Sequence, residues 1–401
     1  MGVTIAFTNA RLVCPAGERT GVLVVAGERI VAGDAPPDAT VIDCGGKHLA
    51  PAIVDLGAFK VDKAACRAGG IVRVGLMPDQ SPVLDDPGIV RRAATMGKPE
   101  LWVHPLAAAT RGLRCEDLAE MAITASAGAR AVATGRRWIG DSGLMRKVLA
   151  YARDLDLTVV SHAEDAGLVG DAVATDGLTA TLLGLSSAPA SAEALAIARD
   201  LLLAEETGAR LHLRQVTTAA GFDLVRAAKR RGVRVTCGIT PAHLLLSDIA
   251  VSDFRTFAHL SPPLRSEADR QACLAALADG TVDVLSSGHD PRGPEEKRLP
   301  FADAAPGAAG ATTLLALGLN LRESAGLSME RLFALLSANP ARILGLDTGT
   351  LQPDEAADLV LFDPHAPWQI TTERDGNTPF DGLPVQGRVL RVWKGGKEIA
   401  A

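Results

Sequence analysis

Histidine and carboxylate side chains that could transfer protons or bind a metal lie at the ends of two apolar runs. His162 ends the run at 157–162, while His289 and Asp290 follow the run at 282–287. Imidazole and carboxylate groups suit general acid–base chemistry, and both bind zinc. One histidine does not make a catalytic zinc site, which needs about three protein ligands and a water. Because side chains of neighbouring residues diverge on a strand, His289 and Asp290 could pair only if the chain turns there.

Eight short apolar runs could position these residues. They alternate with segments of helical 3.6-residue period, such as 143–153 and 191–203. This alternation is typical of parallel strands covered by helices, and it predicts an α/β fold with a (β/α)8 TIM barrel, whose chemistry lies at the C-terminal ends of the strands. The expected strands are at 50–59, 70–77, 101–105, 129–134, 157–162, 209–215, 233–238 and 282–287.

The two ends of the chain have a different pattern from the middle. Short β-rich runs occur at 4–13 and 21–31, and again at 357–363 and 387–397. We therefore predict one small β-sandwich domain built from both termini. The expected boundaries are 1–49 and 346–401 for the two parts of the sandwich, and 50–345 for the barrel.

The bulk properties limit the partners that the chain can have. Of its 401 residues, 47% are apolar and 22% are charged, with a net charge of −6. This acidic balance argues against a nucleic-acid surface, and no apolar run is long enough to cross a bilayer. The six cysteines are scattered without a Cys-x-x-Cys pair, as in a reducing compartment. We expect a cytoplasmic protein that binds neither nucleic acid nor membrane.

Several motifs, in this order and spacing, resemble those of the dihydroorotase family in the amidohydrolase superfamily. They are Ser-His-Ala-Glu-Asp at 161–165, Thr-Pro-Ala-His-Leu-Leu-Leu at 240–246, Pro-Pro-Leu-Arg-Ser at 262–266 and Asn-Pro-Ala-Arg at 339–342. The resemblance covers nearly the whole chain. It implies an amidohydrolase-type barrel and the pyrimidine-pathway reaction that opens and closes a cyclic amide by means of a metal-bound hydroxide.

The same resemblance shows which family positions differ here. The family holds its metals by His-x-His on the first strand and by a histidine on each of the fifth and sixth, and the last strand supplies an aspartate as general base. This chain retains the fifth-strand His162 and otherwise has residues that do not bind metal or transfer protons: Gly57, Phe59, Gln215 and Gly288. The fourth strand lacks the family's acidic ligand and is followed by two cations, Arg136 and Arg137. No metal or other cofactor is therefore expected.

Three further positions match places where the family binds substrate. Arg265 matches an arginine near the substrate, whereas Asp79 and Ser261 stand where the family has asparagine. The negative charge of Asp79 would repel an anionic substrate such as dihydroorotate. Arg265 could equally be a salt-bridged arginine of a loop.

These observations favour a non-catalytic protein among three hypotheses. The resemblance implies that such a homologue is a structural partner of aspartate carbamoyltransferase and part of an oligomer. The second hypothesis is an active cyclic amide hydrolase with a site rebuilt around His162, His289 and Asp290, with or without zinc. The third is a small-molecule sensor that uses the vacated barrel mouth, lined by Phe59, as its pocket.

Overall fold

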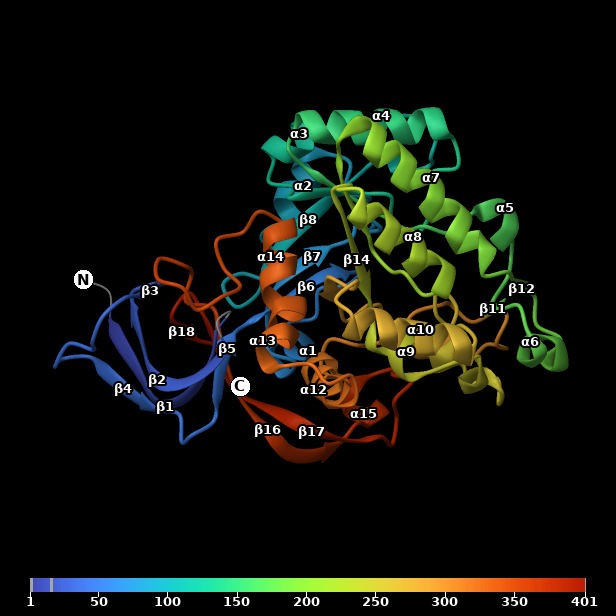
Figure 1. Ribbon diagram of the computed structural model, residues 1–401. Helices are drawn as coiled ribbons and strands as arrows, with labels where there is room; N and C mark the ends of the chain where they lie inside the picture. Colours follow the sequence, from blue (N-terminus) through green and yellow to red (C-terminus); the bar gives the residue numbers. More distant parts are fainter. Residues whose placement is uncertain (1–2, 15–16, 401) are drawn as a thin grey trace.

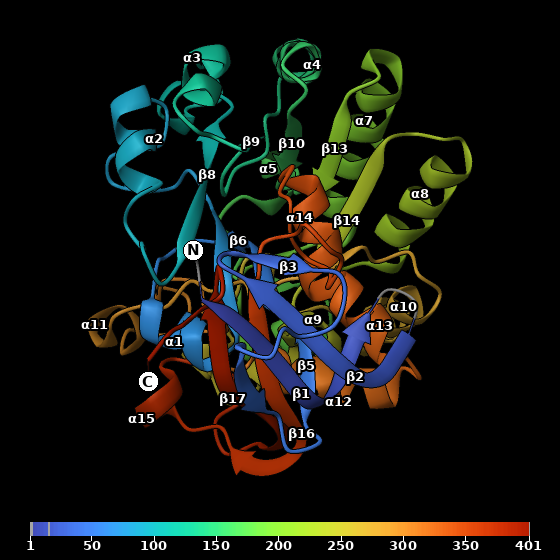
Figure 2. The same cartoon turned by 90° about the vertical axis from the view of Figure 1, so that its left-hand side faces the viewer.

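The computed structural model describes residues 3–14 and 17–400, which form a barrel and a β-rich domain beside it (Figure 1). The β-rich domain contains both ends of the described chain, and the last part of the chain runs beneath the barrel. When the molecule is turned by 90°, the β-rich domain lies in front of the barrel, and helices fan out around the strands (Figure 2).

All eight predicted barrel strands are present. Each pairs in parallel with its neighbour, in the order β15-β14-β13-β10-β9-β8-β7-β6. The bounds are β6 Ile53–Ala58, β7 Ile71–Leu76, β8 Trp102–Ala108, β9 Ala131–Ala133, β10 Thr158–Ser161, β13 Arg210–Leu213, β14 Val235–Ile239 and β15 Val284–Leu285.

The seam between the first and last strands is closed by a buried carboxylate. Asp55 on β6 accepts hydrogen bonds from the backbone N–H of Ser287, at 2.8 Å, and from its hydroxyl. Just beyond, the N–H of Phe59 donates to the carbonyl of His289 at 2.9 Å. Burial raises the pKa of Asp55, against the effect of its hydrogen bonds with Ser287.

Helices cover the outside of the barrel, and the predicted helices at 143–153 and 191–203 are both present. Side chains that cap the first turn begin several of them; Asp141 accepts from the N–H of Leu144 at 2.6 Å. The longer helices are α1 Lys63–Ala68, α2 Pro87–Ala93, α3 Met121–Ser126, α4 Ser142–Asp154, α7 Ser191–Thr207, α8 Ala219–Arg230, α10 Glu267–Ala278 and α12 Leu314–Ser324. Shorter ones are α9 Pro241–Leu245, α11 Pro294–Lys297, α13 Met329–Phe333, α14 Asn339–Ile343 and α15 Thr372–Asp375.

An insertion between β10 and α7, residues 166–190, projects from the barrel; we call it the arm. Its two short strands pair in parallel with each other and are separate from the barrel sheet. The arm consists of α5 Ala166–Val169, β11 Ala174–Thr175, α6 Leu178–Leu183 and β12 Ser187–Ala188.

The β-rich domain joins both termini, as predicted from the sequence. Its strands share one sheet, in which β16 pairs antiparallel with β5. The predicted strand at 21–31 is two strands, because the chain turns at Gly27 with a φ of +62°. The bounds are β1 Thr4–Cys14, β2 Gly17–Ala26, β3 Arg29–Val31, β4 Thr40–Asp43, β5 His48–Pro51, β16 Leu359–Gln369, β17 Pro384–Lys394 and β18 Lys397–Glu398.

A buried ion cluster ties the β-rich domain to the barrel. Asp358 accepts from Nε of Arg73 on β7 at 2.6 Å and from Nζ of Lys394 on β17 at 2.9 Å. Because both oxygens of the buried carboxylate are paired with cations, the Asp-Leu-Val sequence at 358–360 has a structural role here. None of the helices in the described ranges has the length and apolar character needed to cross a membrane.

Candidate functional site: an arginine cluster at the barrel mouth

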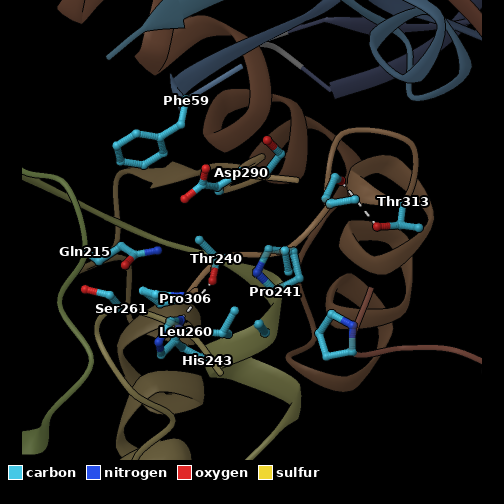
Figure 3. Close-up of a pocket in the computed structure, with 18 of the residues that line it drawn as sticks. Phe59, Gln215, Thr240, Pro241, His243, Leu260, Ser261, Asp290, Pro306 and Thr313 are labelled. Carbon is cyan, nitrogen blue, oxygen red and sulfur yellow. Dashed lines mark hydrogen bonds between the residues drawn. The ribbon is translucent and has the colours of Figure 1, made fainter. Parts of the chain in front are cut away.

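The C-terminal ends of β6, β13, β14 and β15 surround a pocket at the barrel mouth. Figure 3 shows Phe59, Gln215, Thr240, Ser261 and Asp290 around it. The volume open to the centres of water molecules is only about 50 Å³, within about 600 Å³ of space that includes the open mouth. The inner part therefore has room for a few waters. Side chains fill most of the place where a barrel enzyme binds its substrate.

Phe59 is the residue around which these side chains pack. Its side chain is buried, and two guanidinium groups lie over its ring, with the Cζ of Arg136 at 3.8 Å and that of Arg214 at 5.1 Å from the ring centroid. A cation over an aromatic face is attracted by the negative charge density of the ring. The first-strand position that holds a histidine in the related family thus holds an aromatic platform for arginine.

Arg136 is bound on its other sides by carboxylates. Its Nη1 donates to Oδ2 of Asp290 at 2.5 Å, and its backbone N–H donates to Oδ1 of Asp79 at 3.0 Å. Asp290 also accepts from Nη2 of Arg292 at 3.0 Å. Asp290 is therefore paired with two guanidinium groups. Asp79 binds the backbone of Arg136 through one oxygen, and its other oxygen, Oδ2, is buried without a hydrogen-bond partner among the described residues. Asp79 does not line the pocket at the barrel mouth; it lines a neighbouring pocket with Arg136 and Arg137.

Arg214, which follows β13, reaches His162. Its Nη2 donates to Nδ1 of His162 at 3.0 Å, because a guanidinium can only donate. The proton of the imidazole therefore lies on Nε2, which is 3.3 Å from Oε2 of Glu164. Burial, together with the nearby charge of Arg136, lowers the pKa of Arg214 to about 10, so the side chain is still protonated at neutral pH.

Glu164 connects this chain of contacts to Arg265. Its Oε1 accepts from Nη2 of Arg265 at 2.6 Å, and Nε of Arg265 donates to Oγ1 of Thr217 at 3.0 Å. Burial alone would raise the pKa of Glu164, but the hydrogen bond from His162 and the charge of Arg265 outweigh it and lower the pKa to about 2. Arg265 is itself buried and is absent from the pocket wall.

His289 and Asp290 point to different sides of the chain, so the structure does not bring them together as an acid–base pair. Asp290 lines the mouth, whereas His289 lines a separate groove beside α1 and α12. Nδ1 of His289 faces the backbone N–H groups of Gly310 and Ala311, at 3.3 and 3.2 Å. Burial lowers its pKa to about 4, which leaves the ring neutral at pH 7.

The glycines at the two other family positions have positive φ angles that side chains rarely adopt: +105° at Gly57 and +58° at Gly288. A Cβ on Gly288 would lie 2.9 Å from Cγ2 of Thr240. Gln215 faces the pocket, and its buried Oε1 has no hydrogen-bond partner among the described residues.

The side chains at the mouth do not fit the zinc centre that the family resemblance implies. His162 is engaged on both ring nitrogens, one of them by Arg214, and the guanidinium groups of Arg214 and Arg136 lie over Phe59. Across residues 3–14 and 17–400, no group of three or more His, Cys, Asp or Glu side chains could hold a metal ion. A divalent cation here would face arginines without the carboxylate ligands that compensate its charge.

Sequence reasoning missed the roles of Arg214 and Glu164. Arg214 was detectable as the one arginine between Leu211 and Val216, at the end of a barrel strand. Glu164 follows His162 by two residues, so the two side chains lie on the same side of an extended chain. Neither pattern predicts which residue Arg214 or Glu164 contacts, because their contacts join residues that follow different strands.

Comparison with known proteins agrees with the fold and motifs described above. The pattern of the amidohydrolase family matches residues 22–399. A dihydroorotase of Geobacter sp. (strain M21) is 38% identical over 394 residues, covering 94% of this chain and 92% of its own. A dihydroorotase of Syntrophotalea carbinolica is 39% identical over 373 residues, covering 88% and 87%.

Solved structures show the same fold at lower sequence identity. The L-hydantoinase of Arthrobacter aurescens superposes with a TM-score of 0.88 at 23% identity, covering 100% of this chain and 96% of its own. The dihydropyrimidinase of Brevibacillus agri NCHU1002 gives a TM-score of 0.84 at 20% identity, covering 99% and 95%. The chain belongs to the amidohydrolase family and, within it, is a dihydroorotase-like protein.

Proposed function

We propose that this chain is a non-catalytic dihydroorotase-like protein of pyrimidine biosynthesis that acts as a structural partner of aspartate carbamoyltransferase. The observation that carries the proposal is the placement of the Arg136 and Arg214 guanidinium groups over Phe59 at the barrel mouth. Cations stand where a hydrolase of this family needs ligands for a cation.

Hydrolysis of a cyclic amide also needs a group that takes a proton from water, and each candidate at the mouth already has other partners. His162 is bound to Arg214 and Glu164. Asp290 is paired with two arginines. His243 is buried, its Nδ1 is 2.9 Å from the hydroxyl of Thr240, and its Nε2 is 3.0 Å from the carbonyl of Pro262.

The retained family motifs have structural contacts in this chain, which supports a preserved scaffold. Nδ2 of Asn339 donates to the carbonyl of Asp283 at 2.8 Å and joins α14 to the last barrel strand. Nη1 of Arg270 donates to the carbonyl of Leu244 at 2.9 Å and joins α10 to α9. A fold that is kept while its chemical groups are replaced is suited to contact with another protein.

Two experiments on the purified chain test the proposal together. One measures dihydroorotate turnover with added zinc, and the other measures binding to purified aspartate carbamoyltransferase. We expect a complex and no turnover above background. Turnover that disappears in His162→Ala would overturn the proposal and establish an active hydrolase, the second candidate.

The third candidate, a small-molecule sensor, has a separate outcome. A ligand that raises the melting temperature without being turned over would support a sensor that uses the mouth as its pocket. The small inner volume of about 50 Å³ disfavours this candidate, because small-molecule sites are usually several times larger.

A further inference from the structure

The most exposed large apolar side chains of the described residues lie on the arm. Leu178 and Leu182 are 74% and 75% exposed. They are four residues apart on α6, so they lie on the same face of the helix, and this face is turned away from the body of the protein. Figure 1 shows α6 at the outer edge of the molecule.

A second segment with exposed apolar side chains adjoins the arm. Residues 246–254 follow β14 and α9, and a small pocket between the two segments is lined by Thr179 and Ala180 on one side and Asp248 and Val251 on the other. Ile249 is 64% exposed and Phe254 is 48% exposed. Both segments follow barrel strands at their C-terminal ends, so together they form part of the rim of the mouth.

We call the exposed apolar side chains of these two segments the rim patch: Leu168, Leu178, Leu182, Ile249 and Phe254. They are five of the fourteen exposed large hydrophobic residues in the described chain. Single exposed apolar side chains are normal on a protein surface, but several on adjoining segments mark an interaction site.

The charged residues within the two segments of the rim patch are all aspartates. Residues 166–190 contain Asp171 and Asp176 but no lysine or arginine, and residues 246–254 likewise contain only Asp248 and Asp253. Asp171 and Asp176 accept hydrogen bonds from the hydroxyls of Ser186 and Ser187, and Asp253 accepts one from the backbone N–H of Arg255. No cation among the described residues forms an ion pair with any of the four carboxylates. The next cation along the chain, Arg255, is only partly exposed.

The arm is held in place although it projects. The N–H of Val173 donates to the carbonyl of Ser186, and that of Asp176 to Ala188, both at 2.9 Å. Val173, Leu183 and Leu185 pack against a core cluster beneath the arm. An exposed apolar face on an ordered element binds with less loss of conformational freedom than a flexible loop would.

We propose that the rim patch docks a different protein chain, whose contacting face has an apolar centre surrounded by basic side chains. A second copy of this chain would bring its own aspartates against these four, and like charges across an interface disfavour the pairing. The proposal rests on the function proposed above, and it assigns the contact with aspartate carbamoyltransferase to this rim.

Binding to purified aspartate carbamoyltransferase of the same organism, measured by biolayer interferometry, tests the assignment. The test variant carries Leu178→Asp and Leu182→Asp. The control carries Leu195→Asp and Leu202→Asp on α7, where the side chains are 53% and 64% exposed. We expect the test variant to bind at least about tenfold more weakly and the control to bind within about twofold of the wild type. Melting temperatures show whether all chains fold.

A second pair of measurements tests the charges. Asp171→Lys combined with Asp176→Lys should weaken binding, and higher ionic strength should weaken binding of the wild type more than that of this variant. Equal binding by the wild type and the Leu178→Asp, Leu182→Asp variant would overturn the rim assignment and leave the proposed function intact. No binding by the wild type would overturn both. If the wild type self-associates and the Leu178→Asp, Leu182→Asp variant does not, the patch binds a second copy of this chain, and the proposal is overturned.

Discussion

The guanidinium group of Arg136 lies 3.8 Å from the centre of the Phe59 ring while it donates a 2.5 Å hydrogen bond to Asp290. Arg136 follows β9, so its side chain reaches from the fourth barrel strand to the neighbouring ends of the first and last strands. In a metal-dependent relative, a cation at the mouth would join the same strand ends. Here the positive charge is the guanidinium group of Arg136. Removing it should lower the free energy of unfolding.

Arg136→Ala should lower the free energy of unfolding by about 1–3 kcal/mol, because it removes the contact with the Phe59 ring and one of the two cations that balance Asp290. Urea unfolding gives this value. The adjacent Arg137→Ala is the matched control, since its exposed side chain makes no hydrogen bond or ion pair with the described residues, and we expect a change within about 0.5 kcal/mol. Equal effects of the two substitutions would contradict a bridging role for Arg136.

Stability should depend on pH through Glu164. Its pKa in the folded chain is about 2, below its ordinary value of 4.5, so the folded state binds fewer protons than the unfolded state between these values. The contribution of the carboxylate is therefore complete above about pH 4.5 and is lost as the pH falls toward 2. Glu164→Gln should be less stable than the wild type at pH 7. The difference in unfolding free energy between the two chains should become smaller as the pH falls from about 4.5 to 2.

The comparison between the two chains measures Glu164 together with its contacts to His162 and Arg265, because titratable groups that lie away from Glu164 contribute equally to both chains. Glu267→Gln is the control. The hydrogen bond from Arg270 also lowers the pKa of Glu267 to about 2, but Glu267 is exposed on α10, where solvent screening leaves little net energy. A gap between wild type and Glu164→Gln that stays constant from pH 5 to pH 2 would show that Glu164 is not held ionised by His162 and Arg265.

Much of the fold could be predicted from the sequence because buried parallel strands are short apolar runs between helical segments. The eight barrel strands are confirmed for this reason. The run at 21–31 was wrongly predicted as one strand, because its apolar pattern continues on both sides of the turn at Gly27. The short elements of the arm were not predicted, since they pack against a core cluster formed by several later segments of the chain and show no local periodicity.

The sequence indicates which family ligands the candidate site lacks and that Arg136 lies near it, but not which residues contact one another. Gly57, Phe59 and Gly288 are visible as departures from a ligand pattern, whereas the arginines that replace the ligands come from other strands. Arg214 meets His162 across 52 residues of sequence, and the orientation of His289 depends on backbone N–H groups more than 20 residues later. Such contacts depend on the closure of the barrel, which sequence spacing does not encode.

Zinc should neither bind to nor stabilise the wild-type chain. A metal present at a hundred times its dissociation constant would add about 2.7 kcal/mol to the stability and raise the melting temperature. We expect no such rise with zinc, no fall with a chelator, and far less than one zinc per chain by elemental analysis. His162→Ala should leave the zinc content unchanged. One zinc per chain in the wild type that is lost in His162→Ala would contradict the arrangement described for the mouth.

Gly288→Asp should not restore a working carboxylate at the last strand. The residue has a φ of +58°, and a Cβ there would lie 2.9 Å from Cγ2 of Thr240, so the new side chain combines backbone strain with a steric clash. We expect a loss of about 2–4 kcal/mol in unfolding free energy and no turnover of dihydroorotate.

Gly27→Asp is the control that separates backbone strain from the steric clash, because Gly27 has a similar φ of +62° with nothing within 4 Å of an added Cβ. That control should lose only about 1 kcal/mol. Equal losses in the two variants would mean that the backbone angle alone sets the cost, and the space beside Thr240 would then be open to a side chain.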